Sequence, residues 1–386
     1  MITNIELKNF KSIKSKRFDM RRLNIVMGMN GQGKSSFIQS LLLLRQSYGF
    51  ESGSLKLNGG ENGLLNIGVT KDALYQFAGA GENLEYHITF NTKSNLDITT
   101  SYEAGADYFS ISNIEEFQHQ FSEGQIHKEP LFTNSFQYLN AQRVEPAEAN
   151  KASYTSVSLN NDLGKYGEYT AHYIDQNGAQ KLNFRNLIHP SSTDFDEITG
   201  MELTKTSLVD QINFWLGEIS PGVSVKTQKV TNEIVLLDYE FSQPNLGFTN
   251  KFKPQNVGFG ISYALHVVTA ILKAKEGDLV VIENPESHIH PRGQAELGKL
   301  IAKAALNNIQ IIIETHSDHI VNGVRVAVKE NPELKDEVIL HYFEKTIEEK
   351  EQYSKISDIT IDNKGSLSIY PKNFLDEWSN QLFRLM

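Results

Sequence analysis

The sequence contains no cysteine among its 386 residues, which excludes disulfides, thiolate metal ligands and cysteine nucleophiles. It also has no apolar run that approaches the roughly 18 residues needed to span a bilayer. The pattern of Met1–Leu7 is that of a strand rather than of a signal peptide. With 39% hydrophobic and 22% charged residues, we expect a soluble, cytoplasmic globular protein without membrane contact.

An excess of positive charge is missing too, because the formal net charge is −10. A chain that binds nucleic acid over its whole surface is therefore not expected. Residues 1–50 differ, with nine Lys or Arg against two acids, a balance of +7. Two interpretations stay open, a solvated strand edge or a surface that faces phosphates of a nucleotide or nucleic acid. Seven of these residues form what we call the basic strip: Lys8, Lys11, Lys14, Lys16, Arg17, Arg21 and Arg22.

The chain shows no internal repeat and no long heptad pattern, so an extended coiled coil is not expected. What it does contain is a complete phosphate-binding loop at Gly28–Ser35, with the sequence Gly-Met-Asn-Gly-Gln-Gly-Lys-Ser. An apolar run at Leu23–Met27 predicts a buried strand before the loop, and residues 36–48 predict a helix after it. This strand–loop–helix context makes a chance match improbable.

The loop residues have distinct chemical tasks. Glycines allow a tight turn whose N–H groups, with the helix N-terminus, attract phosphate oxygens. Lys34 can reach the β- and γ-phosphates, and Ser35 can ligate Mg²⁺. The predicted nucleotide contacts are Lys11, Asn30, Gly31, Gln32, Gly33, Lys34, Ser35 and Ser36.

The order of apolar segments predicts an α/β fold. Residues 261–273 and 294–306 read as helices, and residues 279–282 and 309–313 as short buried strands, which favours a parallel sheet. We predict an ATPase core from residues 1–50 and 250–386, and an inserted region at 51–249. Within the insertion, residues 50–140 suggest antiparallel β structure, including 84–91, 96–102 and 136–139. The first strand pair is predicted to be residues 2–10 and 23–27, joined by a basic turn.

Hydrolysis of a nucleotide needs an acid for Mg²⁺ and a group that orients water. Leu279–Glu283 is four apolar residues followed by an acid, so Glu283 is the predicted Mg²⁺ acid. Glu286, three residues later, is the predicted base. His316, at the polar end of the strand 311–313, is the predicted γ-phosphate sensor. His288 and His290 suggest supporting or dimer-contact roles rather than a metal site.

Residues 256–262, Asn-Val-Gly-Phe-Gly-Ile-Ser, place glycines and a serine at the N-terminus of a helix. Such a helix start is an anion site. A second anion site in a chain with a complete phosphate loop suggests that two copies share each nucleotide.

These motifs together resemble ABC-type ATPase heads. The branch that they resemble contains the overcoming-lysogenization-defect (OLD) ATPases, RecF, and related AAA-family ATPases of bacterial phage-defence operons. The resemblance lies in the phosphate loop, in residues 5–13, in residues 285–291 (Pro-Glu-Ser-His-Ile-His-Pro), and in the Thr-His-Ser that follows the strand 311–313. It covers about residues 1–50 and 250–325, and the middle matches only in general layout.

The resemblance implies further roles. Gly258, Gly260 and Ser262 would contact the γ-phosphate across a dimer, and Gln142 would link Mg²⁺ to the insertion. ABC heads place a catalytic Glu directly after the Mg²⁺ acid, whereas this chain has Asn284 there. Either Glu286 takes that role or hydrolysis is slow. Too few residues follow Arg325 for the nuclease domain of OLD proteins.

The expected function is an ATP- and Mg²⁺-dependent switch, an ATPase that forms a head-to-tail homodimer or higher even oligomer. It would control a separately encoded effector, plausibly a nuclease, in anti-phage defence. The alternative is a RecF-like repair ATPase that binds DNA through the basic strip. A transporter ATPase subunit fits less well, because those are compact and lack an insertion of this size.

Overall fold

The computed structural model describes residues 1–386 except 48–52, 62, 124, 196–201, 244–245 and 373. Contacts divide the chain into two compact units. Unit 1 comprises Met1–Ser135, Asp336–Asp362 and Leu367–Met386, and unit 2 comprises Phe136–Lys335 and Asn363–Ser366. The division into a core and an insertion at 51–249 follows motifs rather than contacts, and it stays a prediction.

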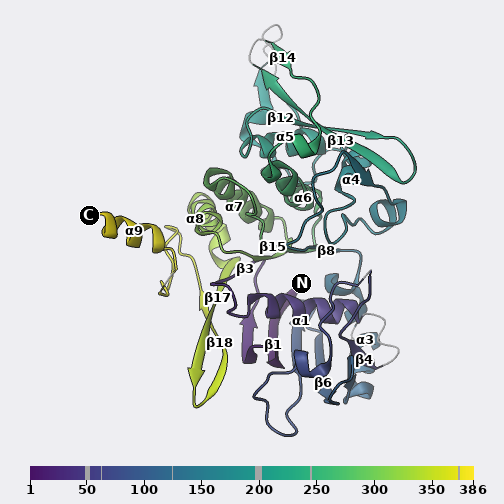
Figure 1. Ribbon diagram of the computed structural model, residues 1–386, viewed down its shortest axis with the longest axis vertical. Coiled ribbons are helices and arrows are strands. Elements are labelled where there is room, and N and C mark those ends of the chain that lie inside the picture. Colours follow the sequence, from purple (N-terminus) through teal and green to yellow (C-terminus); the bar gives the residue numbers. More distant parts are fainter. Residues whose placement is uncertain (48–52, 62, 124, 196–201, 244–245, 373) are drawn as a thin grey trace. The chain divides into compact units, whose positions relative to one another are not determined.

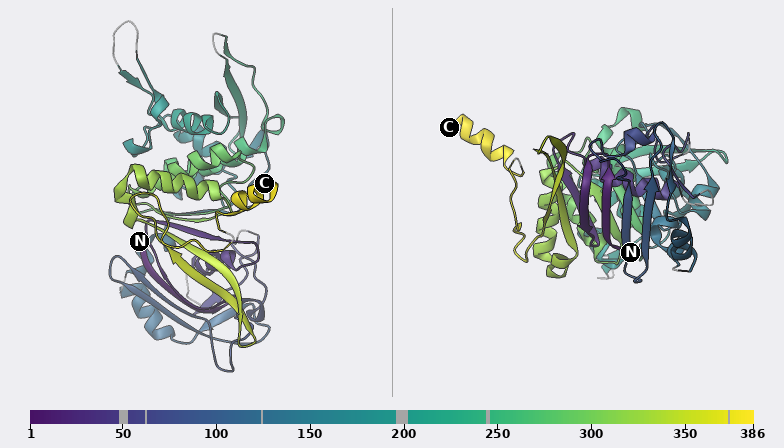
Figure 2. Two further views of the ribbon diagram at one scale, coloured as in Figure 1. Left: turned by 90° about the vertical axis from the view of Figure 1, so that its left-hand side faces the viewer. Right: turned by 90° about the horizontal axis from the view of Figure 1, so that it is seen from below.

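Unit 1 contains a six-stranded antiparallel sheet in the order β2-β1-β5-β6-β7-β4. Its strands lie side by side in the purple-to-blue part of Figure 2. Buried and partly exposed residues alternate along β5, as expected for a sheet with one face on the core. The strands are β1 (Ile2–Phe10), β2 (Ile13–Asp19), β4 (Ser54–Lys56), β5 (Glu85–Phe90), β6 (Asn95–Ser101) and β7 (Tyr108–Ile111).

A second group of strands in unit 1 leads to the phosphate loop. β17 (Val338–Glu348) pairs in parallel with β3 (Leu23–Gly28) and antiparallel with β18 (Glu351–Ile359). The helix α1 (Lys34–Gln46) follows β3 directly. Phe18 of β2 packs against Phe37 of α1, with ring centroids 4.4 Å apart, and against His341 of β17. The other helices of unit 1 are α2 (Thr70–Ala73), α3 (Ile114–Glu123) and α9 (Glu377–Leu385).

The first predicted strand pair is wrong. β1 pairs with β2, residues 13–19, in the place where a basic turn was expected. β2 is rich in Lys and Arg because most of its side chains are partly or fully exposed, while Ile13 and Phe18 are buried. A strand with so few apolar residues has little hydrophobic signal in the sequence.

Unit 2 has the α/β order that the sequence predicts. The strands β16 (Gln310–Glu314), β15 (Leu279–Glu283) and β8 (Phe136–Leu139) lie side by side and parallel. β8 therefore corrects the expectation that residues 136–139 belong to an antiparallel region. The helices α6 (Phe259–Lys273), α7 (Pro291–Ala305) and α8 (Asp318–Glu330) alternate with these strands along the chain (Figure 1).

The rest of unit 2 is an antiparallel sheet with two helices. β12 (Val223–Lys229) pairs with β13 (Ile234–Gln243), which also pairs with β9 (Ala149–Lys151) and β14 (Gly247–Phe248). The helices are α4 (Thr170–Asn177) and α5 (Leu208–Gly217), and β10 (Thr193–Phe195) pairs with β11 (Glu202–Thr204).

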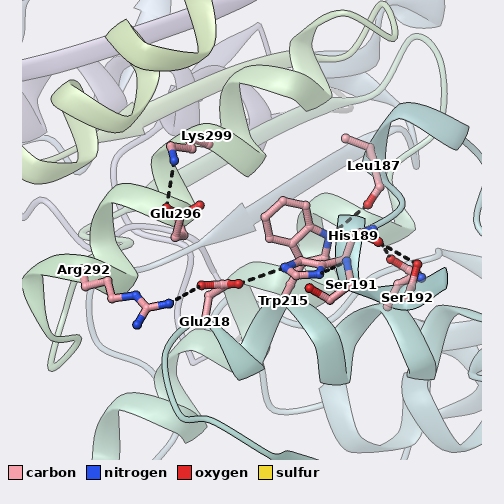
Figure 3. Close-up of polar contacts among 10 residues, drawn as sticks. Leu187, His189, Ser191, Ser192, Trp215, Glu218, Arg292, Glu296 and Lys299 are labelled. Carbon is pink, nitrogen blue, oxygen red and sulfur yellow. Dashed lines mark hydrogen bonds and ion pairs between the residues drawn. The ribbon is translucent and has the colours of Figure 1, made fainter. Parts of the chain in front are cut away.

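A carboxylate connects α5 to α7. Glu218, which follows α5, accepts hydrogen bonds from His189 at 3.2 Å and from Arg292 of α7 at 3.2 Å (Figure 3). His189 is buried and stacks on Phe214. None of the helices in the described ranges is long and apolar enough to cross a membrane.

Candidate functional site

The phosphate loop has a backbone that only glycine adopts without strain. Gly28 and Gly33 have φ values of 143° and 98°. A Cβ at Gly28 would lie 2.3 Å from the Phe343 carbonyl oxygen, and one at Gly33 would lie 2.2 Å from Ser12 Oγ. The chain therefore needs glycine at both positions, for conformation and for space. α1 begins after Gly33 with no side-chain cap, and the Ser36 N–H donates to the Gly33 carbonyl oxygen at 3.0 Å.

Lys34 holds its charge inside the loop. Its side chain is buried, and its ammonium donates to the carbonyl oxygens of Gly28 at 2.9 Å and Met29 at 2.8 Å. Ser35, the next residue, is exposed at the helix start. A cationic side chain, first-turn N–H groups and an exposed hydroxyl are the donor set that a triphosphate with Mg²⁺ needs.

Other predicted loop contacts also bond to the protein. Lys11 donates to Gln39 Oε1 at 2.6 Å, and burial lowers the pKa of Lys11. Gln32 accepts a hydrogen bond from the Lys345 backbone N–H, and Ser36 is buried. Asn30 and Gly31 are exposed.

A brace from the β17–β18 hairpin supports the loop, and sequence reasoning missed it. Ser354 of β18 donates to the Gln32 carbonyl oxygen at 2.7 Å, and its hydroxyl lies 2.8 Å from that of Ser12. The Ser354 backbone N–H also donates to the Ser12 carbonyl oxygen at 2.8 Å. A serine in a polar strand carries no motif, so nothing in the sequence indicates this contact.

In unit 2, Glu283 ends β15 as predicted. Its carboxylate accepts hydrogen bonds from the Tyr138 hydroxyl at 2.9 Å and from the Ala141 N–H at 3.2 Å. Burial raises the pKa of Glu283, while these hydrogen bonds oppose the shift. An ionised carboxylate has about four lone-pair positions, so two remain for a metal-bound water. The residues present therefore fit an Mg²⁺ acid.

Glu286 lies against the end of β16. One carboxylate oxygen accepts from the Thr315 hydroxyl at 2.8 Å, and the other accepts from the His316 N–H at 2.9 Å. Burial raises the pKa of Glu286, and the hydrogen bonds again oppose it. The chain reaches this position because Asn284 adopts a left-handed turn with φ 44°, which asparagine tolerates better than most residues. Asn284 thus occupies the turn, and the second carboxylate comes two residues later.

Arg143 is a residue of this site that the sequence prediction passed over. Its guanidinium donates to the Glu283 carbonyl oxygen at 2.7 Å, but Nε and Nη1 are buried without a hydrogen-bond partner. Burial lowers the pKa of Arg143 to about 10, and Glu283 and Glu286 both oppose that shift. Unsatisfied buried donors are rare and call for an explanation. The only sequence signal is an arginine directly after the singled-out Gln142.

The predicted γ-phosphate sensor, His316, and the predicted Mg²⁺ linker, Gln142, are both exposed side chains. His316 is exposed after β16, and its backbone N–H holds Glu286. Gln142 is exposed in the loop whose Ala141 N–H contacts Glu283. The structure therefore brings Glu283, Glu286 and His316 together, with Gln142 in the adjoining loop.

The Gly258–Ser262 segment forms the start of α6 as predicted. A Cβ at Gly258 would meet no atom within 4 Å, whereas one at Gly260 would lie 2.4 Å from the His288 carbonyl oxygen. The Ser262 hydroxyl is buried, 3.3 Å from the hydroxyl of Tyr239. Gly258 and Phe259 are exposed at this helix start, whereas the serine hydroxyl is covered.

The two histidines near Glu286 have structural partners. His290 caps α7 by accepting from the Arg292 N–H at 3.3 Å, and the His288 ring packs edge-on against Tyr263 at 4.9 Å. Within the described parts of the chain, no group of three or more His, Cys, Asp or Glu side chains is arranged to hold a metal ion. A metal here would therefore depend on bound phosphate and water as well as on Glu283.

Comparison with known proteins matches residues 23–322 to the family "AAA domain, putative AbiEii toxin, Type IV TA system". Residues 335–385 match "Protein of unknown function (DUF3696)". The DNA replication and repair protein RecF of Francisella tularensis subsp. novicida (strain U112) is 30% identical over 95 residues, which are 24% of this chain and 26% of that protein. The chain therefore spans about a quarter of the length of the curated relatives it matches.

Among solved structures, an Smc head bound to the C-winged helix domain of ScpA aligns with a TM-score of 0.53. The identity is 11%, and the alignment covers 93% of this chain and 98% of that chain. An Smc head with an extended coiled coil, bound to ScpA derived from Pyrococcus furiosus, aligns at 12% identity with a TM-score of 0.46, over 100% of this chain and 99% of that chain. The first of these likenesses shows the fold of an ABC-type ATPase head. Because the AAA family model spans well over half of the sequence, the chain belongs to that AAA family, and its fold is that of an ABC-type ATPase head.

Proposed function

We propose that this chain binds ATP with Mg²⁺ through its phosphate loop and hydrolyses it slowly. The observation that carries the proposal is the loop itself: glycines at positive φ, a helix start without a side-chain cap, and the buried Lys34 side chain. ATP with Mg²⁺ supplies the charge that these donors match. Lys34 and Ser35 hold phosphate and metal, Glu283 holds the metal through water, and Glu286 accepts the proton of the attacking water.

We further propose that two copies join head to tail around ATP. The N–H groups at Gly258 of one copy would face the γ-phosphate on the loop of the other, as the family resemblance implies. Opening and closing would then signal to a separately encoded effector protein. A role in bacterial anti-phage defence is the biological setting that the resemblance favours.

The test is nucleotide affinity in Lys34→Ala. Loss of the ammonium removes the charge that contacts the phosphates, and we expect ATP binding to weaken by about 10- to 100-fold or more, since hydrogen bonds to charged groups contribute about 1.5–3 kcal/mol each. Equilibrium dialysis with labelled ATP measures it.

The matched control for that variant is Lys14→Ala, because Lys14 is exposed and pairs with Glu351 away from the loop. Circular dichroism would show whether each variant keeps its fold. An affinity in well-folded Lys34→Ala equal to that of the unchanged chain would refute the loop assignment.

DNA binding of the RecF kind is the second candidate, supported by the RecF match. The contacts of the basic strip weaken it. Five of its seven members form ion pairs with acids of unit 1, at N–O distances of 2.6–3.4 Å: Lys8, Lys14, Lys16, Arg17 and Arg22. Charge that is already paired gains less from a phosphate backbone.

A further inference from the structure

The last residue of α6 is a buried lysine with few partners. Lys273 is 4% exposed, and its ammonium donates one hydrogen bond, to the Asn161 carbonyl oxygen at 2.6 Å. It also lies 5.4 Å from the centre of the Tyr173 ring. An ammonium has three N–H donors, and with the residues that the structure describes Lys273 forms no ion pair within 4 Å. Among the described residues, its charge is therefore buried with one hydrogen bond and no direct counter-ion.

Lys273 lines a polar cavity of about 240 Å³ in unit 2. Of the described residues in the cavity walls, two more are lysines, Lys181 and Lys275, several are amides, and none is Asp or Glu. Asn183 and Gln180 are among the amides. Three cations without a carboxylate make the cavity electrostatically suited to an anion.

The carboxylates that affect Lys273 lie outside the cavity walls and have other partners. Asp162 accepts from the Gln137 side chain at 3.0 Å and from the Gly164 N–H at 2.9 Å. Asp278 accepts from the Lys275 backbone N–H at 2.9 Å. Burial lowers the pKa of Lys273 to about 8, and the pull of these two acids only partly opposes it. The two acids therefore do not fully offset the cost of burying the Lys273 charge.

We propose that this cavity binds a small oxyanion, the carboxylate or phosphate group of a metabolite, through the Lys273 ammonium. The volume is below the roughly 300–1,000 Å³ of pockets for drug-sized ligands, so the ligand is smaller than a nucleotide. The site shares no residue with the phosphate loop or with Glu283 and Glu286. It lies at the opposite end of α6 from Gly258, about 22 Å along the axis for 15 residues at 1.5 Å each.

Sulfate is the first probe, because it does not titrate near neutral pH. Calorimetric titration would use the Lys34→Ala chain, so that the phosphate loop does not contribute. We expect saturable sulfate binding that weakens about 10- to 100-fold in Lys34→Ala/Lys273→Met, as for loss of hydrogen bonds to a charged group. The matched control is Lys34→Ala/Lys299→Met, since Lys299 lies on α7 outside the cavity and pairs with Glu296.

A pH series on the Lys34→Ala chain needs no substitution at Lys273. Sulfate affinity should fall as pH rises through about 8, because Lys273 loses its proton, and by about tenfold per pH unit beyond that. The other charged or titratable groups near Lys273 are two carboxylates, Asp162 and Asp278, the tyrosine Tyr173, and two exposed lysines, Lys181 and Lys275. Burial raises the pKa of Tyr173 to about 12, well above the range of the series. A drop centred near pH 8 therefore reports Lys273.

Phosphate and succinate titrations distinguish the two chemistries, and chloride is the reference. Tighter binding of phosphate than succinate assigns a phosphate group, and the reverse assigns a carboxylate. The proposal is overturned if none of the oxyanions binds more tightly than chloride. It is overturned equally if Lys273→Met, shown by urea unfolding to be folded, leaves sulfate affinity unchanged. Neither result bears on ATP binding at the loop.

Discussion

Two carboxylates and one arginine set the electrostatics at the end of β15. Glu283 and Glu286 are each held by two hydrogen bonds, and Arg143 supplies the positive charge that favours their ionised forms. Burial pushes both pKa values up, and the arginine and hydrogen bonds pull them down. Such opposed effects keep the pKa of a carboxylate in a range where the group can accept and release protons during a reaction.

Glu286→Gln should retain ATP binding and lose turnover. A general base contributes about 10²- to 10⁴-fold to rate, and the amide cannot accept a proton. We expect ATP to hold the variant in its dimer. Steady-state phosphate release and sedimentation with ATP measure the two effects.

The control is Glu296→Gln on α7, which loses only a partly exposed ion pair. In the unchanged chain, the acidic limb of the pH–rate profile should lie above the pKa of about 4.3 of a free glutamate, because burial raises the pKa of Glu286. Normal turnover in Glu286→Gln would move the base elsewhere, to Glu283 or to water positioned by Asn284.

Arg143→Gln should destabilise the fold by about 1–3 kcal/mol, because the Glu283 carbonyl loses its donor and both carboxylates lose their counter-charge. Without that charge the pKa values of Glu283 and Glu286 rise further. The acidic limb of the pH–rate profile should then shift to higher pH. Urea unfolding and the pH profile measure the two effects.

The matched control for the arginine is Arg292→Gln, whose guanidinium is largely exposed and pairs with Glu218 (Figure 3). An exposed pair of this kind contributes at most about 1 kcal/mol. A shift of the pH limb in the control as large as in Arg143→Gln would show that the effect is not local to the site.

At this scale the sequence predicts residues whose type and spacing are tied to chemistry. The Glu at the end of an apolar strand and the polar end of the next strand lie where expected. Arg143, Tyr138 and Ser354 could not be predicted, because their roles depend on which segments fold against them. The Ser262 hydroxyl is similar: its spacing is right for a helix start, but Tyr239 of β13 covers it.

At the scale of elements, α6 connects two features. Its first residues carry the exposed N–H groups at Gly258, and its last residue is Lys273. Gly260 is fixed by the His288 carbonyl, but Gly258 faces open space. Gly258 is therefore the position at which a side chain can block the helix start without disturbing the core.

Mixing Lys34→Ala with Gly258→Arg subunits should restore ATPase activity, whereas each alone should have almost none. If the site is shared, half of randomly formed dimers are mixed, and each has one intact site, so the mixture should reach at most about a quarter of normal activity. Colorimetric phosphate release measures it.

The control mixture is Lys34→Ala with Glu286→Gln. Both changes affect the half-site that one chain contributes, so the mixed dimer contains no intact site and should stay inactive. Rescue in this control, or none in the first mixture, would contradict sharing between a loop and a partner helix.

Elements with strong apolar periodicity were predictable. α1, α6, α7, β15 and β16 lie within a few residues of their expected bounds. β2 was not, because a polar strand at the edge of a sheet resembles a loop in composition. The strand β8 was predicted in place but not in direction, since a strand of four residues does not show which strand it will join.

At the scale of the whole molecule, net charge and its pairing bear on DNA binding. The chain has a formal net charge of −10, and most residues of the basic strip form ion pairs with acids. We expect weak duplex binding at low salt that disappears at physiological salt, with a log–log slope corresponding to few phosphate contacts. Fluorescence anisotropy with labelled duplex across a salt series measures it.

A steep slope with nanomolar affinity at physiological salt would instead favour the RecF-like alternative. Lys14→Glu is an informative variant there, because Lys14 lies in the strip and outside the loop. The sequence could show that positive charge gathers in residues 1–50, but not that acids as distant as Glu337, Glu351 and Asp358 neutralise it. Such pairs form only when the C-terminal strands fold beside the N-terminal ones.

The hairpin of β17 and β18 belongs to the segment that matches a family of unknown function. Through Ser354 it is fastened to Ser12 and to Gln32, the residue before the last glycine of the loop. Sliding the hairpin along β3 would break those bonds to the phosphate loop. We therefore expect that removing residues 338–359 would loosen the phosphate loop and weaken any phosphate bound there.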